Sequence, residues 1–85
     1  MIVDDDRTTV KLLKTLLELD GFTVSVAALG GEVMELAGKE QPDLFLLDYH
    51  LADMDGVEVL RQLRDSETFA KVPIVFASGL NVEDE

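Results

Sequence analysis

The sequence contains no cysteine, few basic residues and no long apolar run. Without cysteine the chain can form neither a disulfide framework nor a thiolate metal site, as is typical of proteins in a reducing cytoplasm. The chain has only 7 Lys and Arg residues against 18 Asp and Glu residues, which gives a formal net charge of -11. This charge disfavours direct contact with nucleic acid, because its phosphates are bound by clustered basic side chains. No stretch of about twenty apolar residues exists, and three aspartates follow Val3 where a signal peptide would be basic. We therefore expect a cytoplasmic protein without membrane contact.

The composition is nevertheless that of a folded domain. A hydrophobic fraction of 47% argues against disorder, and 85 residues hold at most one small domain. Four short segments are rich in strand-forming residues, namely residues 1–4, 22–27, 43–47 and 72–77. Several carry apolar residues at successive positions, which indicates strands covered on both faces of a parallel sheet.

Helical spacing fills the intervals between these strands. The first helix should begin at a cap on Asp6 or Thr8, end before Gly21, and bury an apolar stripe made of Val10, Leu13, Leu16 and Leu17. A second helix is predicted over residues 32–39, between the Gly30-Gly31 turn and Pro42.

Gly56 opens a third helix that should end near Ser66 and bury one face, made of Val57, Val59, Leu60 and Leu63. Asn81 could cap a fourth helix.

The alternation of strands and helices predicts an α/β fold, a doubly wound parallel sheet with helices on both faces. In such sheets the ligand site lies beyond the carboxyl ends of the strands.

Polar residues follow three of the predicted strands at that rim: Asp4 and Asp5, Asp48, and Ser78. Converging carboxylates repel one another, so the site should take up a hard cation such as Mg2+, which prefers oxygen ligands and retains waters. An aspartate beside the ion could then attack phosphorus and form an acyl phosphate, with the Ser78 hydroxyl bonded to a phosphoryl oxygen. Aspartates after strands also serve as helix caps, and Asp6 is as well suited to capping as to binding metal.

With these residues placed, the sequence resembles the response-regulator receiver family of two-component signalling over essentially all 85 positions. The motifs that carry the resemblance occur in family order and spacing, namely residues 3–6 (VDDD), 42–48 (PDLFLLD), 54–56 (MDG) and 72–78 (VPIVFAS). The resemblance implies a flavodoxin-like sheet with strand order 2-1-3-4. It also implies that Asp48 is the phosphoacceptor, that Asp5 binds Mg2+ directly and Asp4 chiefly through water, and that His50 is a ligand through its backbone carbonyl.

By the same resemblance Ser78 hydrogen-bonds the phosphoryl group and moves on activation, while Gly79 leaves the site accessible. The implied activity is that of a phosphoacceptor switch rather than an enzyme, although such a domain promotes its own phosphorylation and dephosphorylation. A histidine kinase or a histidine phosphotransfer protein would donate the phosphoryl group. An output domain or target protein would read the switch.

The sequence departs from the family pattern at its end. Residues 1–85 would form a single receiver domain that is incomplete at the C-terminus, because strand 5, helix 5 and the lysine that contacts the phosphoryl group are absent. This leaves an alternative, a receiver-like interaction module without phosphotransfer, and the exposed edge of the strand at 72–77 would favour a homodimer. A phosphatase of the haloacid dehalogenase type is disfavoured, since His50 stands where its second acid is needed.

Overall fold

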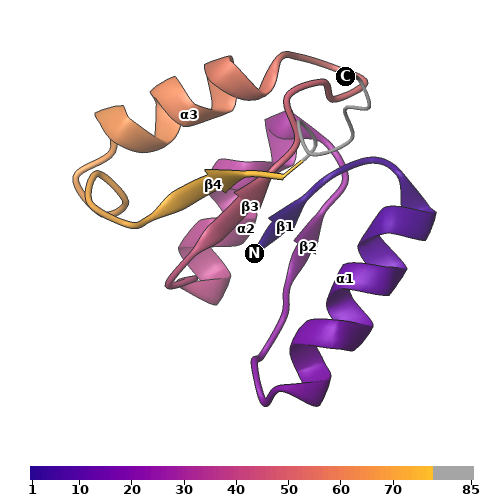
Figure 1. The fold of residues 1–85 in the computed structure, drawn as a ribbon. Coiled ribbons are helices and arrows are strands. Elements are labelled where there is room, and N and C mark those ends of the chain that lie inside the picture. Colours follow the sequence, from indigo (N-terminus) through magenta and orange to yellow (C-terminus); the bar gives the residue numbers. More distant parts are fainter. Residues whose placement is uncertain (78–85) are drawn as a thin grey trace.

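The computed structural model describes residues 1–77, and its centre is a parallel sheet of four strands (Figure 1). The strands are β1 (Ile2–Val3), β2 (Val26–Ala27), β3 (Phe45–Leu47) and β4 (Ile74–Phe76). They lie in the order β2-β1-β3-β4, and each pair of neighbours is parallel. The predicted doubly wound sheet with order 2-1-3-4 is therefore confirmed.

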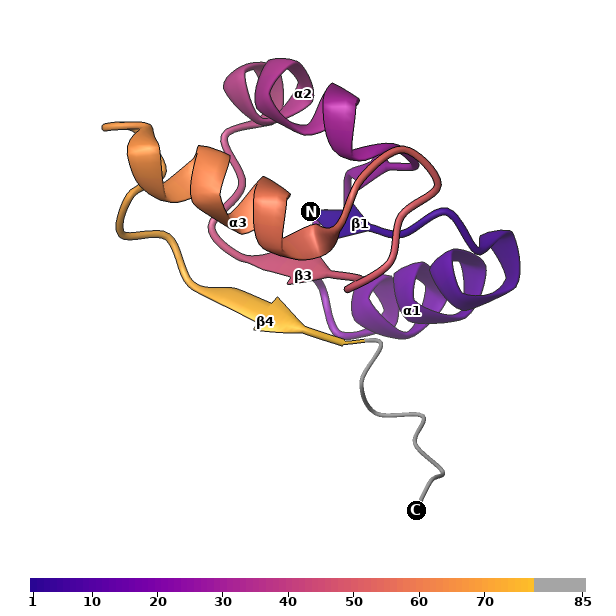
Figure 2. The same ribbon diagram turned by 90° about the horizontal axis from the view of Figure 1, so that it is seen from above.

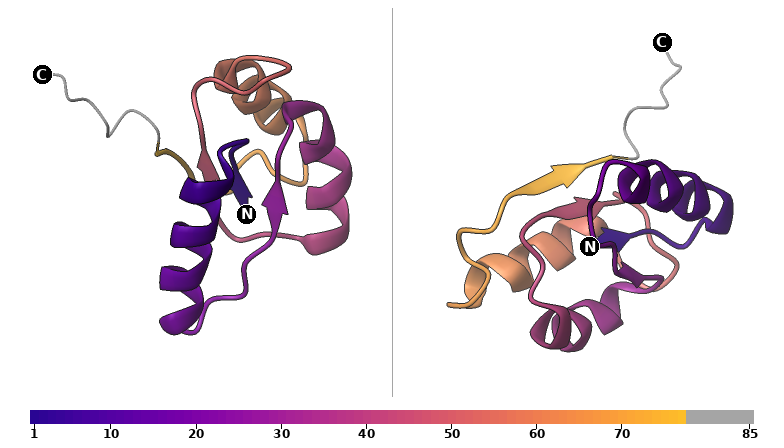
Figure 3. Two further views of the ribbon diagram at one scale, coloured as in Figure 1. Left: turned by 90° about the vertical axis from the view of Figure 1, so that its right-hand side faces the viewer. Right: turned by 90° about the horizontal axis from the view of Figure 1, so that it is seen from below.

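Helices cover both faces of this sheet. α1 (Arg7–Leu19) lies on one face, and α2 (Val33–Glu40) and α3 (Gly56–Asp65) lie together on the other (Figures 2 and 3). A 3-10 turn, η1 (Gly30–Glu32), leads directly into α2, so this helix is shifted by one residue from the predicted range. None of the described helices is long and apolar enough to cross a membrane.

The core lies between the sheet and the α2/α3 layer. The side chains of Val3, Phe45 and Leu47 on the two central strands are fully buried there. They pack against a set of buried residues from α2, α3 and the turn after α3, namely Val33, Ala37, Val59, Leu63 and Phe69. The rings of Phe45 and Phe69 meet edge to face with centroids 5.8 Å apart, an arrangement that aromatic quadrupoles favour. This packing fixes the two strands whose ends carry the acidic residues.

Both ends of α1 follow the predicted signals. The Asp6 side chain accepts a hydrogen bond from the Thr8 backbone N–H at 3.2 Å, so Asp6 and not Thr8 is the cap. At the other end the chain reverses through Gly21, whose φ is +92°. The N–H groups of Gly21 and Phe22 then donate to the carbonyls of Glu18 and Leu17, the bonding pattern of a Schellman motif.

Three expectations about the sheet and the helix faces were wrong in part. Only residues 26 and 27 of the predicted strand at 22–27 form strand structure, and Phe22 at its start is 60% exposed. Leu16 and Val57, both predicted to face inward, are 53% and 49% exposed. α1 in fact has no fully buried residue. Its least exposed apolar residues, Val10, Leu13 and Leu17, are only half-buried. The α1 face is thus the less covered of the two.

Two glycine substitutions should have opposite effects on stability. Gly21→Ala places a Cβ on a residue with positive φ and should lower the free energy of unfolding by about 1 kcal/mol. Gly38→Ala, its control, lies inside α2 with open space around the new Cβ and should raise that free energy by up to about 1 kcal/mol. Urea unfolding of the two variants tests this, and a stabilising Gly21→Ala would contradict the positive-φ turn.

Candidate functional site

The pairing of β1 with β3 brings the predicted acidic residues together. Val3 pairs with Leu47, so the next residues along each strand, Asp4 and Asp48, emerge side by side at the carboxyl rim. The backbone N–H of Asp48 donates to the Val3 carbonyl at 2.9 Å and continues the ladder up to that point. Asp5 follows at the same rim, and one carboxylate oxygen from each of the three aspartates lies within 4.8 Å of the others.

Asp4 is the buried member of this group. Its residue is 7% exposed, and one carboxylate oxygen accepts the backbone N–H of Asp6 at 2.9 Å. Burial raises the pKa of the Asp4 carboxyl, and the neighbouring carboxylates of Asp48 and Asp5 raise it further. The hydrogen bond from Asp6 opposes this shift but does not cancel it. Ionisation of Asp4 therefore carries an electrostatic cost that a nearby cation would offset.

The donor set fits a hard divalent cation. All three groups offer carboxylate oxygens, the ligand type that Mg2+ and Ca2+ prefer. Oxygens bound directly to one octahedral Mg2+ lie roughly 3 to 4 Å apart. A cluster within 4.8 Å is close to this size, so a small contraction, or a water between the ion and one carboxylate, would complete the contact. Asp6 does not belong to the cluster, because its carboxylate caps α1 and accepts the Thr9 hydroxyl at 2.6 Å.

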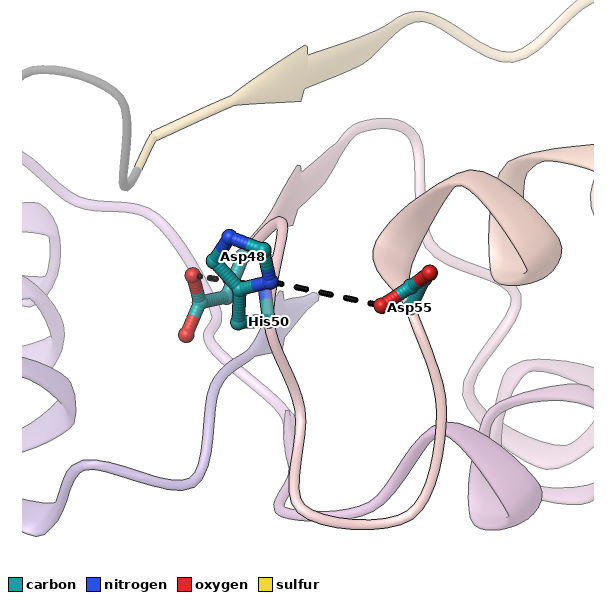
Figure 4. Close-up of polar contacts among 3 residues, drawn as sticks. All are labelled: Asp48, His50 and Asp55. Atoms are coloured by element: carbon teal, nitrogen blue, oxygen red, sulfur yellow. Dashed lines mark hydrogen bonds and ion pairs between the residues drawn. The ribbon is translucent and has the colours of Figure 1, made fainter.

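Asp48 is half-buried and begins the loop that leads to α3. Its Oδ1 accepts the backbone N–H of His50 at 3.3 Å, which orients the carboxylate (Figure 4). The imidazole of His50 has its Nδ1 4.0 Å from a carboxylate oxygen of Asp55, and the side chain is 90% exposed. This contact is a loose surface pair, and it leaves the backbone of His50 as the part of the residue that is tied to Asp48.

Gly56 and Tyr49 hold this loop against the rest of the fold, and sequence analysis had given neither a role at the site. A Cβ on Gly56 would overlap the carbonyl oxygen of Asp48, and the Gly56 N–H donates to the Tyr49 carbonyl at 2.7 Å. The Tyr49 ring stacks on Phe76 of β4, with centroids 4.2 Å apart and an interplanar angle of 11°. The start of α3 and the end of β4 therefore both touch the segment that carries Asp48.

Asp53 is a further residue that sequence analysis missed. Its two carboxylate oxygens accept the backbone N–H groups of Gly30 and Gly31 at 2.9 and 2.8 Å. These bonds favour the ionised form, so the pKa of Asp53 is lowered. The available signal was the Gly30-Gly31 pair ahead of a helix, because the first N–H groups of a helical segment need acceptors.

The other predicted site residues, Ser78 and Gly79, lie outside the described residues, as does Asn81. The residues that the structure does bring together are thus Asp4, Asp5 and Asp48, with the backbone of His50 beside them.

Comparisons with known proteins agree with this geometry. The family model described as the response regulator receiver domain matches residues 1–85. The polar-differentiation response regulator DivK of Brucella ovis is 35% identical over 85 residues, which are all of this chain and 69% of DivK.

Solved structures give the same picture. The N-terminal domain of a response regulator receiver protein from Methanoculleus marisnigri has a TM-score of 0.82 and 33% identity, over 86% of this chain and 59% of that one. A response regulator from Burkholderia pseudomallei, solved with a phosphorylated aspartic acid, a calcium ion and citrate, has a TM-score of 0.81 and 27% identity, over 92% of this chain and 45% of that one. The chain thus spans less than two thirds of each of these two solved chains. The family match over its whole length, together with the sheet order and the acidic rim, shows that the chain belongs to the response-regulator receiver family, the signalling domains of two-component systems.

Proposed function

We propose that this chain takes up a phosphoryl group on Asp48 in a Mg2+-dependent reaction and passes the signal on through a change of conformation. The observation that carries the proposal is the convergence of three carboxylates from two neighbouring strands within 4.8 Å, one of them buried. Phosphoryl transfer needs a positioned nucleophile and a charge to balance the phosphate oxygens, and this rim offers the first and the ligands for the second.

The metal ligands would be Asp5 and Asp48 directly, Asp4 chiefly through water, and His50 through its backbone carbonyl. Asp5 is exposed and can reach an ion directly, whereas Asp4 is buried and held by its bond to the Asp6 N–H. When bound, Mg2+ would neutralise the cluster and a phosphate oxygen together. Two or three carboxylates suffice for such a site, because Mg2+ usually keeps several waters.

The chemical step would occur at a carboxylate oxygen of Asp48. This oxygen forms a bond to phosphorus while the bond from phosphorus to the ring nitrogen of a donor phosphohistidine breaks, and the donor leaves as histidine. The bond from the His50 N–H to Oδ1 of Asp48 holds the carboxylate in one orientation for in-line attack by its other oxygen. The phosphorylated aspartic acid and calcium ion in the Burkholderia pseudomallei relative are consistent with this assignment.

The charge of the added phosphoryl group would then change the conformation at the end of β4. Response regulators in general work with histidine kinases and with output domains or targets, and we assign this chain a histidine kinase or a histidine phosphotransfer protein as donor. The Ser78 hydroxyl would move to a phosphoryl oxygen, and Gly79 would leave room for it. The Tyr49 ring belongs to the residue after Asp48 and stacks on Phe76 of β4, so such a movement would displace it.

Phosphorylation can be tested with a small donor. The intact protein, incubated with Mg2+ and acetyl phosphate, should gain the mass of one phosphoryl group, and EDTA should prevent the gain. Asp48→Asn removes the nucleophilic oxygen and should abolish the adduct, whereas Asp55→Asn, in the same loop, should retain it. Mass spectrometry of the intact protein measures both. An unmodified wild-type protein would favour the alternative of an interaction module without phosphotransfer.

The electrostatic cost of ionising Asp4 leads to a second prediction, which concerns the pH dependence of stability. Because the pKa of Asp4 is raised, the folded chain holds a proton that the unfolded chain has lost between the ordinary and the raised pKa. The free energy of unfolding therefore falls as pH rises through that window, and the loss is complete above it. Asp4→Asn, which keeps an oxygen to accept the Asp6 N–H, should raise Tm at pH 7 without Mg2+ and have little effect below the ordinary aspartate pKa.

The matched control is Glu67→Gln, which removes one charge from the exposed turn after α3. It should leave the response of Tm to Mg2+ unchanged, because Glu67 is not part of the acidic cluster. Mg2+ should raise the Tm of the wild-type protein more than that of Asp4→Asn, because the ion and the substitution relieve the same repulsion. A lower Tm for Asp4→Asn at pH 7 would show that the carboxylate cluster is not strained.

A further inference from the structure

The loop between Asp48 and α3 is closed on itself. Residues 49–55 are here called the acceptor loop. A hydrogen bond of 2.7 Å from the N–H of Gly56, the residue after the loop, to the carbonyl of Tyr49 joins its two ends. Inside it, the Leu51 N–H donates to the Met54 carbonyl at 3.1 Å, and His50 faces Asp55 as an isolated antiparallel bridge. These contacts tie the two sides of the loop together, so we expect a displacement of its tip to be transmitted to His50 and Asp48.

The tip of the acceptor loop is anchored to the start of α2. Asp53 accepts both the Gly30 and the Gly31 N–H groups through separate oxygens, across 22 or more positions of sequence. The Met54 side chain lies directly on Gly30, where a Cβ would fall 2.5 Å from a Met54 carbon. The polar and the apolar contact meet on the same turn, η1, which continues into α2.

Of these two contacts, the hydrogen bonds of Asp53 are the one with a fixed geometry. Its carboxylate is ionised, and hydrogen bonds to an ionised acceptor are about twice as strong as neutral ones. The next two N–H groups upstream, those of Ala28 and Leu29, are both taken by the Glu32 carboxylate at 3.2 Å. Each carboxylate thus has its own pair of donors, and Glu32 does not replace Asp53 at Gly30 and Gly31.

We propose that Asp53 is a positioning residue for the metal and phosphoryl site and that it couples occupation of this site to the start of α2. Its carboxylate is bonded to η1 and is not one of the three that form the acidic cluster. It fixes the acceptor loop so that the His50 backbone is held beside the carboxylates of Asp48, Asp4 and Asp5. The inference rests on the proposed function, since it concerns the ligand geometry of that same site.

The first test compares Mg2+ affinities in the intact protein. Asp53→Ala should raise the Mg2+ dissociation constant, measured by calorimetric titration, by about tenfold, as loss of a group that orients metal ligands does. Asp53→Asn keeps one acceptor oxygen and should lie between Asp53→Ala and wild type. Asp55→Asn removes the same charge from the same loop and should stay within about twofold of wild type, which separates positioning from charge.

The second test measures the coupling itself. In the wild-type protein, Mg2+ should slow hydrogen exchange at the Gly30 and Gly31 amides, and in Asp53→Ala it should have no effect there. A purely structural role for Asp53 would speed exchange equally with and without Mg2+ and leave the affinity unchanged. If Asp53→Ala does not fold, Asp53→Asn supplies both measurements.

The outcomes distinguish the role of Asp53 from the proposed function. If the wild-type protein binds Mg2+ and the Asp53 variants bind it equally well, the role of Asp53 is wrong and the proposed function stands. If the wild-type protein binds no Mg2+ and gains no phosphoryl group, the proposed function fails and the role of Asp53 fails with it.

Discussion

The register between β1 and β3 holds together carboxylates that would otherwise move apart. Val3 and Leu47, the last residues of the two strands, pair with one another and are fully buried, so neither strand can slide or turn to separate Asp4 from Asp48. The repulsion therefore persists in the folded state, where it adds to the effect of burial in raising the pKa of Asp4. A cation site of this kind depends on a core whose packing energy outweighs the repulsion between the carboxylates of the site.

The parallel sheet and the acidic rim could be predicted because their signals are local and strong, whereas the strand order was implied by the resemblance to the receiver family. Apolar runs that end in Asp at residues 4 and 48 indicate buried parallel strands, and parallel strands present their carboxyl ends at one edge. The α1 termini were also readable, since the cap at Asp6 and the stop at Gly21 depend on adjacent residues. The three carboxylates that the sequence placed at this rim do lie together.

What could not be predicted depends on neighbours that are distant in sequence. Residues 22–25 have strand-forming side chains, but β1 covers only Ile2–Val3 and pairs with Val26 and Ala27. Its hydrogen bonds reach back only to Ser25, whose carbonyl accepts the Ile2 N–H at 2.9 Å. The spacing of Leu16 and Val57 identifies an apolar stripe without saying how widely another layer covers it. Asp53 resembles any loop aspartate until the fold brings Gly30 beside it, and the contact of Gly56 with the Asp48 carbonyl exists only once the loop closes.

The aromatic stack beside the acceptor has an optical consequence. Tyr49 is the single tyrosine of the chain, which has no tryptophan, and its ring lies flat on Phe76. Within this chain, near-ultraviolet absorption and emission above the phenylalanine bands therefore come from one chromophore that adjoins Asp48. The receiver domain carries its own spectroscopic reporter, and a change in that signal on adding an ion or a phosphodonor arises at the rim of the sheet.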